Sequence, residues 1–347
     1  MKIKTSRIFS DTVLNPFRAI ADAPADAVVE ALVAQGGMAE LRNTMTFLGD
    51  AAALDVSTQS AVVQEFMIEN NKLPTWLDKQ KLDTGLVFFW KNAQQIAITL
   101  GCYSLPYCYA AADGAQVLWL SERIKNDTFK RLEETGEFLF GIMQERDWQN
   151  GKNVVKILKI RLIHAIARYF SVHSKQWDIA WGTPVNQEDM AGTNLAFSYI
   201  ALRGLRKLGV ATTEAEEEAY LHLWNVVGAL LGVNEQLLPQ NLREAFQLDK
   251  AIATRHFKPS EAGQGLAKAL LKTLELQIAA NNAALQSFPA AQMRFLLGDE
   301  IADLLDLPKV GLETSLLKLT TNLPISPQKI VFGSEPPKGA LSKYVRN

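Results

Sequence analysis

Hydrophobic residues recur with helical spacing along nearly the whole chain. Apolar positions at i, i+3, i+4 and i+7 indicate a buried helix face, and Gly, Pro and Asp-Gly interrupt the pattern. The run "QVLWL" is the one short segment that fits a strand, and it fits a buried helical turn equally well. The fold class is therefore predicted to be all-α. The predicted helices cover 26–35, 38–53, 58–69, 81–100, 116–124, 128–144, 152–173, 187–208, 214–232, 240–249, 261–287, 289–305 and 310–321.

The segment "PVNQEDMAGTNLAFSYIALRGLRKLG" shows how the helix ends are assigned. Asn186 can cap the first turn, and the charge of Asp189 suits the positive end of the helix dipole. Gly209 supplies the left-handed residue that ends a helix. The sequence therefore marks both boundaries of this helix.

One segment, "RLIHAIARYF", has an unusual pattern for a helix. At about 100° per residue, Arg161, His164 and Arg168 share one narrow face, and apolar residues cover the remaining circumference. Such a helix is normally buried, and burying a guanidinium without a partner costs several kcal/mol. An anionic or strongly polar group is therefore expected to face these three residues, called here the charged stripe.

Composition limits the classes of partner. The 347 residues are 48% hydrophobic and 21% charged, with a net charge of -1, so no basic surface for nucleic acid is expected. The absence of a signal-peptide core and of a long apolar run predicts a cytoplasmic protein without stable membrane insertion. Two cysteines favour a reducing compartment. We expect a single domain over 1–347 with a mobile tail at about 334–347, and the sequence leaves the oligomeric state open.

Familiar catalytic motifs are missing from the sequence. It contains no Gly-rich phosphate loop, no HExxH and no nucleophile elbow. No two of its four histidines have the four-residue spacing of a helical zinc or di-iron site. A metal site built from protein ligands alone is therefore disfavoured.

The charged stripe is compatible with haem, which needs one axial imidazole, an apolar slot and cations near its propionates. His164 would bind the iron, the small Ala165 would let the flat ring approach, and Arg161 and Arg168 would meet the propionates. The alternative is a core histidine hydrogen-bonded to a carbonyl, with both arginines paired to Asp or Glu of neighbouring helices. The spacing alone leaves both interpretations open.

Several blocks resemble the rubber oxygenase family, which includes the latex clearing protein of actinobacteria and the prenyl-cleaving oxygenase of mycophenolate biosynthesis. The blocks follow the family's order and together cover about 70–305, most of the chain. They are "LPTWLD", "YSLPYCYAAADGAQVLWLSERI", "RLEETGEF", "RLIHAIARYF" and the segment from Pro184 to Gly209 quoted above.

This resemblance implies a globin-like helical core that holds haem b, with His164 as the proximal ligand. It also implies O2-dependent cleavage of a carbon–carbon double bond into two carbonyl products. On the distal side, Arg131, Glu134 and Thr135 share one helical face with Phe138. Arg131 and Thr135 are expected to orient the bound oxygen.

The chain departs from the rubber-cleaving pattern on the catalytic side. Glu134 stands where those members carry a lysine, and Gly114 or Ala115 lies near the position of a glutamate thought to assist catalysis. A buried carboxylate has a raised pKa and can exchange protons, but it cannot replace an ammonium ligand. We therefore expect a small unsaturated lipid or terpenoid as substrate, and a haem or apolar-ligand carrier or a haem peroxidase as alternatives.

Asp189 and Thr193 also match a block of the family, "D-x-x-x-T". Helix capping and packing explain both residues without a function, and a role in the pocket is the other interpretation.

Overall fold

A computed structural model describes residues 7–121, 127–279 and 287–309. The helix predicted over 310–321 and the tail predicted at 334–347 lie outside these residues. The described part is all-α, as predicted, and its one extended pairing is an isolated bridge between Ala111 and Phe257. The principal helices are α2 (Ala23–Gly49), α3 (Ala61–Asn70), α4 (Lys79–Lys91), α5 (Ala93–Thr99), α6 (Leu105–Tyr109), α7 (Ala112–Leu120), α9 (Thr128–Ile142), α10 (Glu145–Gln149), α11 (Lys152–His173), α12 (Gln187–Leu195), α13 (Ala201–Lys207), α14 (Glu214–Leu230), α15 (Leu242–His256), α16 (Glu261–Ala279), α17 (Phe288–Leu297) and α18 (Asp299–Leu304).

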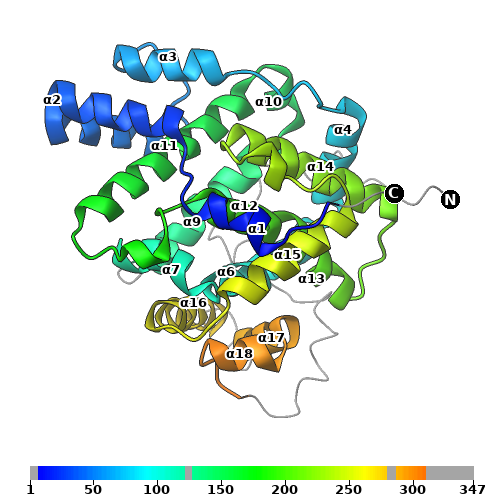
Figure 1. Ribbon diagram of the computed structural model, residues 1–347. Helices are drawn as coiled ribbons and strands as arrows, with labels where there is room; N and C mark the ends of the chain where they lie inside the picture. The colour runs from blue at the N-terminus through cyan, green and yellow to red at the C-terminus, as the bar shows by residue number, and fades with distance from the viewer. Residues whose placement is uncertain (1–6, 122–126, 280–286, 310–347) are drawn as a thin grey trace.

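Figure 1 shows how these helices are arranged: α2 and α3 lie at one edge of the molecule and α16, α17 and α18 at the opposite edge. Helix α11 lies between them and packs against α2, α9, α14 and α7. Its contacts with α2 are the most extensive of these. The helix that carries the charged stripe is therefore surrounded by other helices, as its apolar circumference predicts.

The predicted boundaries around α12 are confirmed. The side chain of Asn186 accepts a hydrogen bond from the backbone N–H of Asp189 at 3.0 Å, and Gly209 has a φ of 76°. The helix between them contains a π-helical turn at Ala196–Ile200, which separates α12 from α13. Such a turn contains one extra residue and does not change the hydrophobic pattern enough to be read from the sequence.

The stretch around Pro106 is more helical than the sequence predicts. A π-helical turn at Leu100–Ser104 leads directly into α6, and Pro106 occupies the first turn of that helix. Proline is tolerated in a first turn because its missing N–H has no helical partner to lose. The segment "QVLWL" belongs to α7, so the helical interpretation of that run is the right one.

Helices α4 and α14 approach each other closely at Gly85. A Cβ atom added there would lie 2.7 Å from the carbonyl oxygen of Ala219 and 3.0 Å from Cβ of Leu223. The backbone carbonyl cannot move aside as a flexible side chain can. Gly85 therefore sets the distance between the two helices.

We predict that Gly85→Ala lowers the free energy of unfolding by about 1–3 kcal/mol, because the added methyl group forces α4 away from α14. Urea denaturation followed by circular dichroism measures the change. Gly49→Ala is the matched control, since a Cβ atom there meets nothing within 4 Å, and its stability should be unchanged or slightly raised. Equal stability of both variants would contradict the close packing.

Candidate functional site

Two carboxylates at the start of α2 face the charged stripe of α11. The Arg161 guanidinium donates through Nε to Oδ2 of Asp22 at 2.7 Å and through Nη2 to Oδ1 at 2.8 Å, while its Nη1 donates to Oδ1 of Asn70 at 3.1 Å. Arg168 donates through Nε to Oδ1 of Asp26 at 2.6 Å and through Nη1 to the carbonyl oxygen of Val185 at 3.3 Å. The arginines are therefore paired with Asp residues of a neighbouring helix, as the alternative interpretation of the stripe predicts.

The two arginines differ in how completely they are satisfied. All three nitrogens of Arg161 have a partner, and its bidentate pair with Asp22 is buried beneath Gly232. Arg168 is only 4% exposed, and its Nη2 is buried without a hydrogen-bond partner among the described residues. A buried, unpaired guanidinium N–H is costly, so Nη2 of Arg168 is the donor of the stripe that is able to receive a further anionic group.

His164 lies between the two ion pairs and is held in its neutral form. Burial is the main cause that lowers its pKa to about 4, and the positive charges of Arg168 and Arg131 lower it further, against the opposing effect of Asp22. Its Nδ1 is buried and has no hydrogen-bond partner in the part of the chain that the structure describes. Among these residues the carbonyl hydrogen bond of the alternative interpretation is not made by this atom.

The predicted distal residues lie on α9, and one of them is near His164. Arg131 is close enough to affect the pKa of His164 and also that of Tyr109 on α6. Its Nη1 donates to Oε2 of Glu134 at 2.8 Å, and the two side chains are 35% and 33% exposed. Glu134, one turn along the same helix, therefore partly neutralises the positive charge of Arg131.

Thr135 completes the predicted face of α9. Its hydroxyl donates to the carbonyl oxygen of Arg131 at 2.7 Å, so only its lone pairs face outward in this arrangement. The face formed by Leu132 and Leu139 is buried, whereas Glu134 and Phe138 are half-buried. The predicted face of α9 therefore borders the buried face and is partly accessible.

The stripe fits haem in part. A neutral imidazole is the form that binds iron, and Nη2 of Arg168 is free to meet a propionate. Arg161 does not fit the role of a propionate partner, because Asp22 and Asn70 use its nitrogens. Ala165 is 1% exposed and packs in the core. Among the described residues no group of three or more His, Cys, Asp or Glu can hold a metal ion. A metal at His164 would therefore need further ligands that are not protein side chains.

Sequence reasoning predicted an anionic partner for the stripe but did not identify Asp22 and Asp26. The signal available was the stretch "DAPAD", in which an acidic residue precedes a proline in the first turn of a helix. That pattern predicts a helix start and nothing about which distant helix it meets. The pairing of residues about 140 positions apart becomes visible only in the folded chain.

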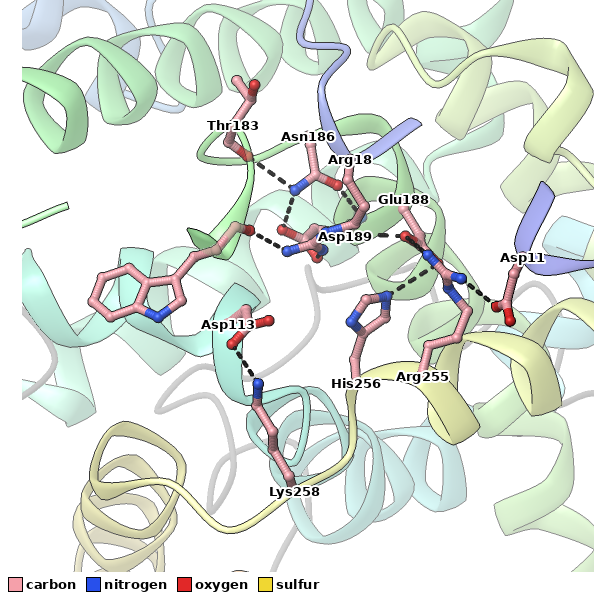
Figure 2. Close-up of polar contacts among 11 residues, drawn as sticks. Asp11, Arg18, Asp113, Thr183, Asn186, Glu188, Asp189, Arg255, His256 and Lys258 are labelled. Atoms are coloured by element: carbon pink, nitrogen blue, oxygen red, sulfur yellow. Dashed lines mark hydrogen bonds and ion pairs between the residues drawn. The ribbon is translucent and has the colours of Figure 1, made fainter. Parts of the chain in front are cut away.

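A second polar cluster joins the start of α12 to the end of α15 (Figure 2). Glu188 accepts from Nε of Arg255 at 2.8 Å and lies 3.0 Å from Nε2 of His256. Asp189 accepts from Nδ2 of Asn186 at 2.7 Å and pairs with Arg18, whose guanidinium also donates to the carbonyl oxygen of Trp181. The loop before α12 is therefore held by charged hydrogen bonds on both sides.

Comparisons with known proteins show the family to which the chain belongs. The family model described as "ER-bound oxygenase mpaB/B'/Rubber oxygenase, catalytic domain" matches residues 99–321, which is more than half of the chain. The protein therefore belongs to this oxygenase family. No helix within 7–121, 127–279 or 287–309 has the length and hydrophobicity needed to span a membrane.

Two relatives define the similarity further. The chain is 25% identical to the rubber oxygenase of Streptomyces sp. (strain K30) over 252 residues, which are 71% of this chain and 61% of that protein's length. The solved structure of latex clearing protein in the closed state matches with a TM-score of 0.70 at 22% identity, covering 94% of this chain and 90% of the other. The second similarity supports the all-α fold.

We predict that Asp22→Asn lowers the free energy of unfolding by about 3 kcal/mol, because it leaves the Arg161 guanidinium buried without its carboxylate. Asp303→Asn is the control, since Asp303 pairs with Arg294 but is about half exposed, and its loss should lower stability much less than Asp22→Asn does. Urea denaturation of both variants measures the difference. Losses of similar size would show that the pair between α2 and α11 is not desolvated.

Proposed function

We propose that the protein is a haem b-dependent oxygenase that uses O2 to cleave a carbon–carbon double bond of a small isoprenoid or unsaturated lipid. The observation that supports this proposal is His164 on α11. Its imidazole is buried and neutral, and the neighbouring Arg168 has a buried Nη2 without a hydrogen-bond partner among the described residues. Membership of an oxygenase family supports it. That family includes more than one oxygenase, so the substrate of this chain is part of the proposal.

In this proposal the residues of α11 hold the cofactor. His164 would bind the haem iron, Nη2 of Arg168 would bind a propionate, and the small Ala165 would let the ring approach α11. Arg161 would act indirectly, by fixing α2 against α11 through Asp22. Bound haem would supply an iron centre at which O2 is activated.

The residues of α9 would face the substrate side. Arg131 and Thr135 would orient the oxygen, and Glu134 would position the Arg131 guanidinium and offset its charge through their ion pair. The overall reaction breaks one carbon–carbon double bond and one O–O bond and forms two carbonyl groups. Both oxygen atoms end in the products, so the reaction needs no external reductant.

A carrier of haem or of an apolar ligand is a second candidate. The observation that favours it is the ion pair between Arg131 and Glu134, which neutralises the cation nearest to His164 on α9. Carrier and oxygenase would share the residues of α11. Only turnover distinguishes them.

The test is O2 uptake by haem-loaded protein in the presence of isoprenoids of 10 to roughly 20 carbons. An oxygenase consumes O2 only with substrate and forms two carbonyl fragments that carry label from 18O2. A carrier binds the same compounds without consuming O2, and a peroxidase forms products only when peroxide is added. Either of these two results would overturn the proposed activity.

We predict that His164→Ala loses most of the bound haem, because the variant removes the one protein bond to iron that the proposal contains. Haem content per chain after purification and reconstitution measures the loss. His173→Ala, His222→Ala and His256→Ala are the controls and should keep the wild-type spectrum. Loss of haem in one of these instead would move the axial ligand away from α11.

We predict that Glu134→Gln keeps haem content and fold but changes O2-dependent turnover or its pH profile, because it releases Arg131 from its ion pair. Glu134→Lys is the sharper variant: the lysine amine, once deprotonated, can bind the iron and convert a five-coordinate ferric spectrum into a six-coordinate one. An unchanged spectrum from neutral to alkaline pH, with full haem loading, would show that this face of α9 does not lie over the iron.

A further inference from the structure

A group of buried tyrosines lies where the two π-helical turns meet. Tyr103 belongs to the turn at Leu100–Ser104 and Tyr199 to the turn at Ala196–Ile200, and the two turns contact each other. Tyr107 follows Tyr103 by one turn, on α6, and all three side chains are buried. π-Helical turns occur frequently at functional sites. Tyr103, Tyr107 and Tyr199 are called here the tyrosine cluster.

Tyr107 has a proton acceptor in contact with its hydroxyl. Its Oη donates to Oδ1 of Asp249 at 2.9 Å, which joins α6 to α15 (Figure 1). The other carboxylate oxygen, Oδ2, accepts from Nη1 of Arg203 at 3.0 Å. Burial raises the pKa of Asp249 to about 6, although Arg203 and Tyr107 oppose the shift, so this carboxylate takes up a proton more readily than an exposed one.

Tyr103 is the neighbour of Tyr107 and lacks such an acceptor. The two ring centroids are 5.7 Å apart, and the rings are nearly perpendicular. The hydroxyl of Tyr103 is buried without a hydrogen-bond partner among the described residues. Arg203 and Lys207 lie 5.8 Å and 5.2 Å from the centre of its ring, and neither accepts a proton in its charged form. The two phenols are therefore alike in burial and differ in having a base beside them.

This difference decides which of the two phenols can be oxidised. A phenol that loses one electron becomes a strong acid, so in a buried site its proton must pass to a base in the same step. At Tyr107 one electron leaves the ring, the Oη–H bond breaks, and the proton binds Oδ1 of Asp249. The products are a neutral tyrosyl radical and a neutral carboxylic acid, and reduction of the radical returns the proton. Tyr103 would instead keep a buried positive charge beside two cations, which is costly.

Helix α6 also leads toward the predicted cofactor site. Burial raises the pKa of Tyr109, two residues after Tyr107, and the charge of Arg131 opposes this rise. The same charge adds to the burial that lowers the pKa of His164, so Arg131 is near both residues. The tyrosines of "GCYSLPYCY" therefore extend from the neighbourhood of the predicted cofactor site to the tyrosine cluster.

We propose that Tyr107 and Asp249 form a redox-active pair, in which oxidation of the phenol is coupled to proton transfer to the carboxylate. Its oxidant in this protein is haem that a peroxide has oxidised. The peroxide removes two electrons from ferric haem and is reduced to an alcohol or water, and Tyr107 returns one of the two. One oxidising equivalent then rests on Tyr107 rather than on the residues that hold the cofactor. This activity goes beyond the proposed oxygenase reaction and rests on the proposed function only for the haem itself.

Peroxide treatment of the haem-loaded protein tests the pair. The protein is mixed with hydrogen peroxide, frozen and examined by electron paramagnetic resonance, which identifies a tyrosyl radical and measures its amount per haem. The wild type should form this radical, and Tyr107→Phe should lose most of it. Tyr103→Phe is the matched control, because it removes a neighbouring buried phenol that has no acceptor, and its yield should equal that of the wild type. Asp249→Asn should also lose most of the signal, since an amide accepts a hydrogen bond but takes up no proton.

A second oxidant separates this inference from the proposed function. Flash excitation of a ruthenium complex with persulfate oxidises tyrosine without haem. In haem-free protein, the long-lived tyrosyl absorbance should fall in Tyr107→Phe and stay at the wild-type level in Tyr103→Phe. This result in a protein that binds no haem would reject the proposed function and keep the redox-active pair.

Other results would overturn the inference. Equal radical yields in the wild type and Tyr107→Phe, or loss of the radical in Tyr103→Phe instead, would show that Tyr107 and Asp249 are not a redox-active pair. A radical with the ruthenium oxidant but none with peroxide would overturn the role of haem as the oxidant. If Asp249→Asn fails to fold, the two phenylalanine variants provide the decision, since each keeps its aromatic ring in the core.

Discussion

The structure depends on removing two guanidinium groups from water on the same face of α11. Such a face is stable only if carboxylates meet it, and the first turn of α2 supplies them through Asp22 and Asp26. The match is complete for Arg161 and incomplete for Arg168, whose Nη2 stays unpaired. The imidazole between them is therefore held neutral among cations and in a dry environment, which suits a metal ligand better than an acid or a base.

The loop before α12 connects this stripe to the polar cluster at the start of α12. The carbonyl oxygen of Val185 accepts from Arg168, and Asp189 follows four residues later. Val185 has a φ of 49°, an unusual backbone conformation for a β-branched residue that costs of the order of 1–3 kcal/mol. Such strain persists where the surrounding contacts fix the backbone, and here those contacts come from both α11 and Arg18.

The sequence predicted the features that depend on local periodicity and capping. The helical pattern of 152–173 and the Asn186 cap both follow from residues within a few turns of one another. It did not predict the π-helical turns at 100–104 and 196–200, because one extra residue in a turn leaves hydrophobic spacing nearly unchanged. Nor did it identify the partners of Arg161 and Arg168, since nothing local to α11 specifies α2. The roles of the α9 residues, the single-domain organisation and the compartment stay predictions.

The central claim is that this stripe binds one haem per chain, and titration of haem into cofactor-free protein tests it most directly. The account predicts saturable growth of a Soret band with an end point at one haem per chain, and a further shift when the ferrous form binds carbon monoxide. Binding without saturation, or no Soret band with a correctly folded protein, would contradict it.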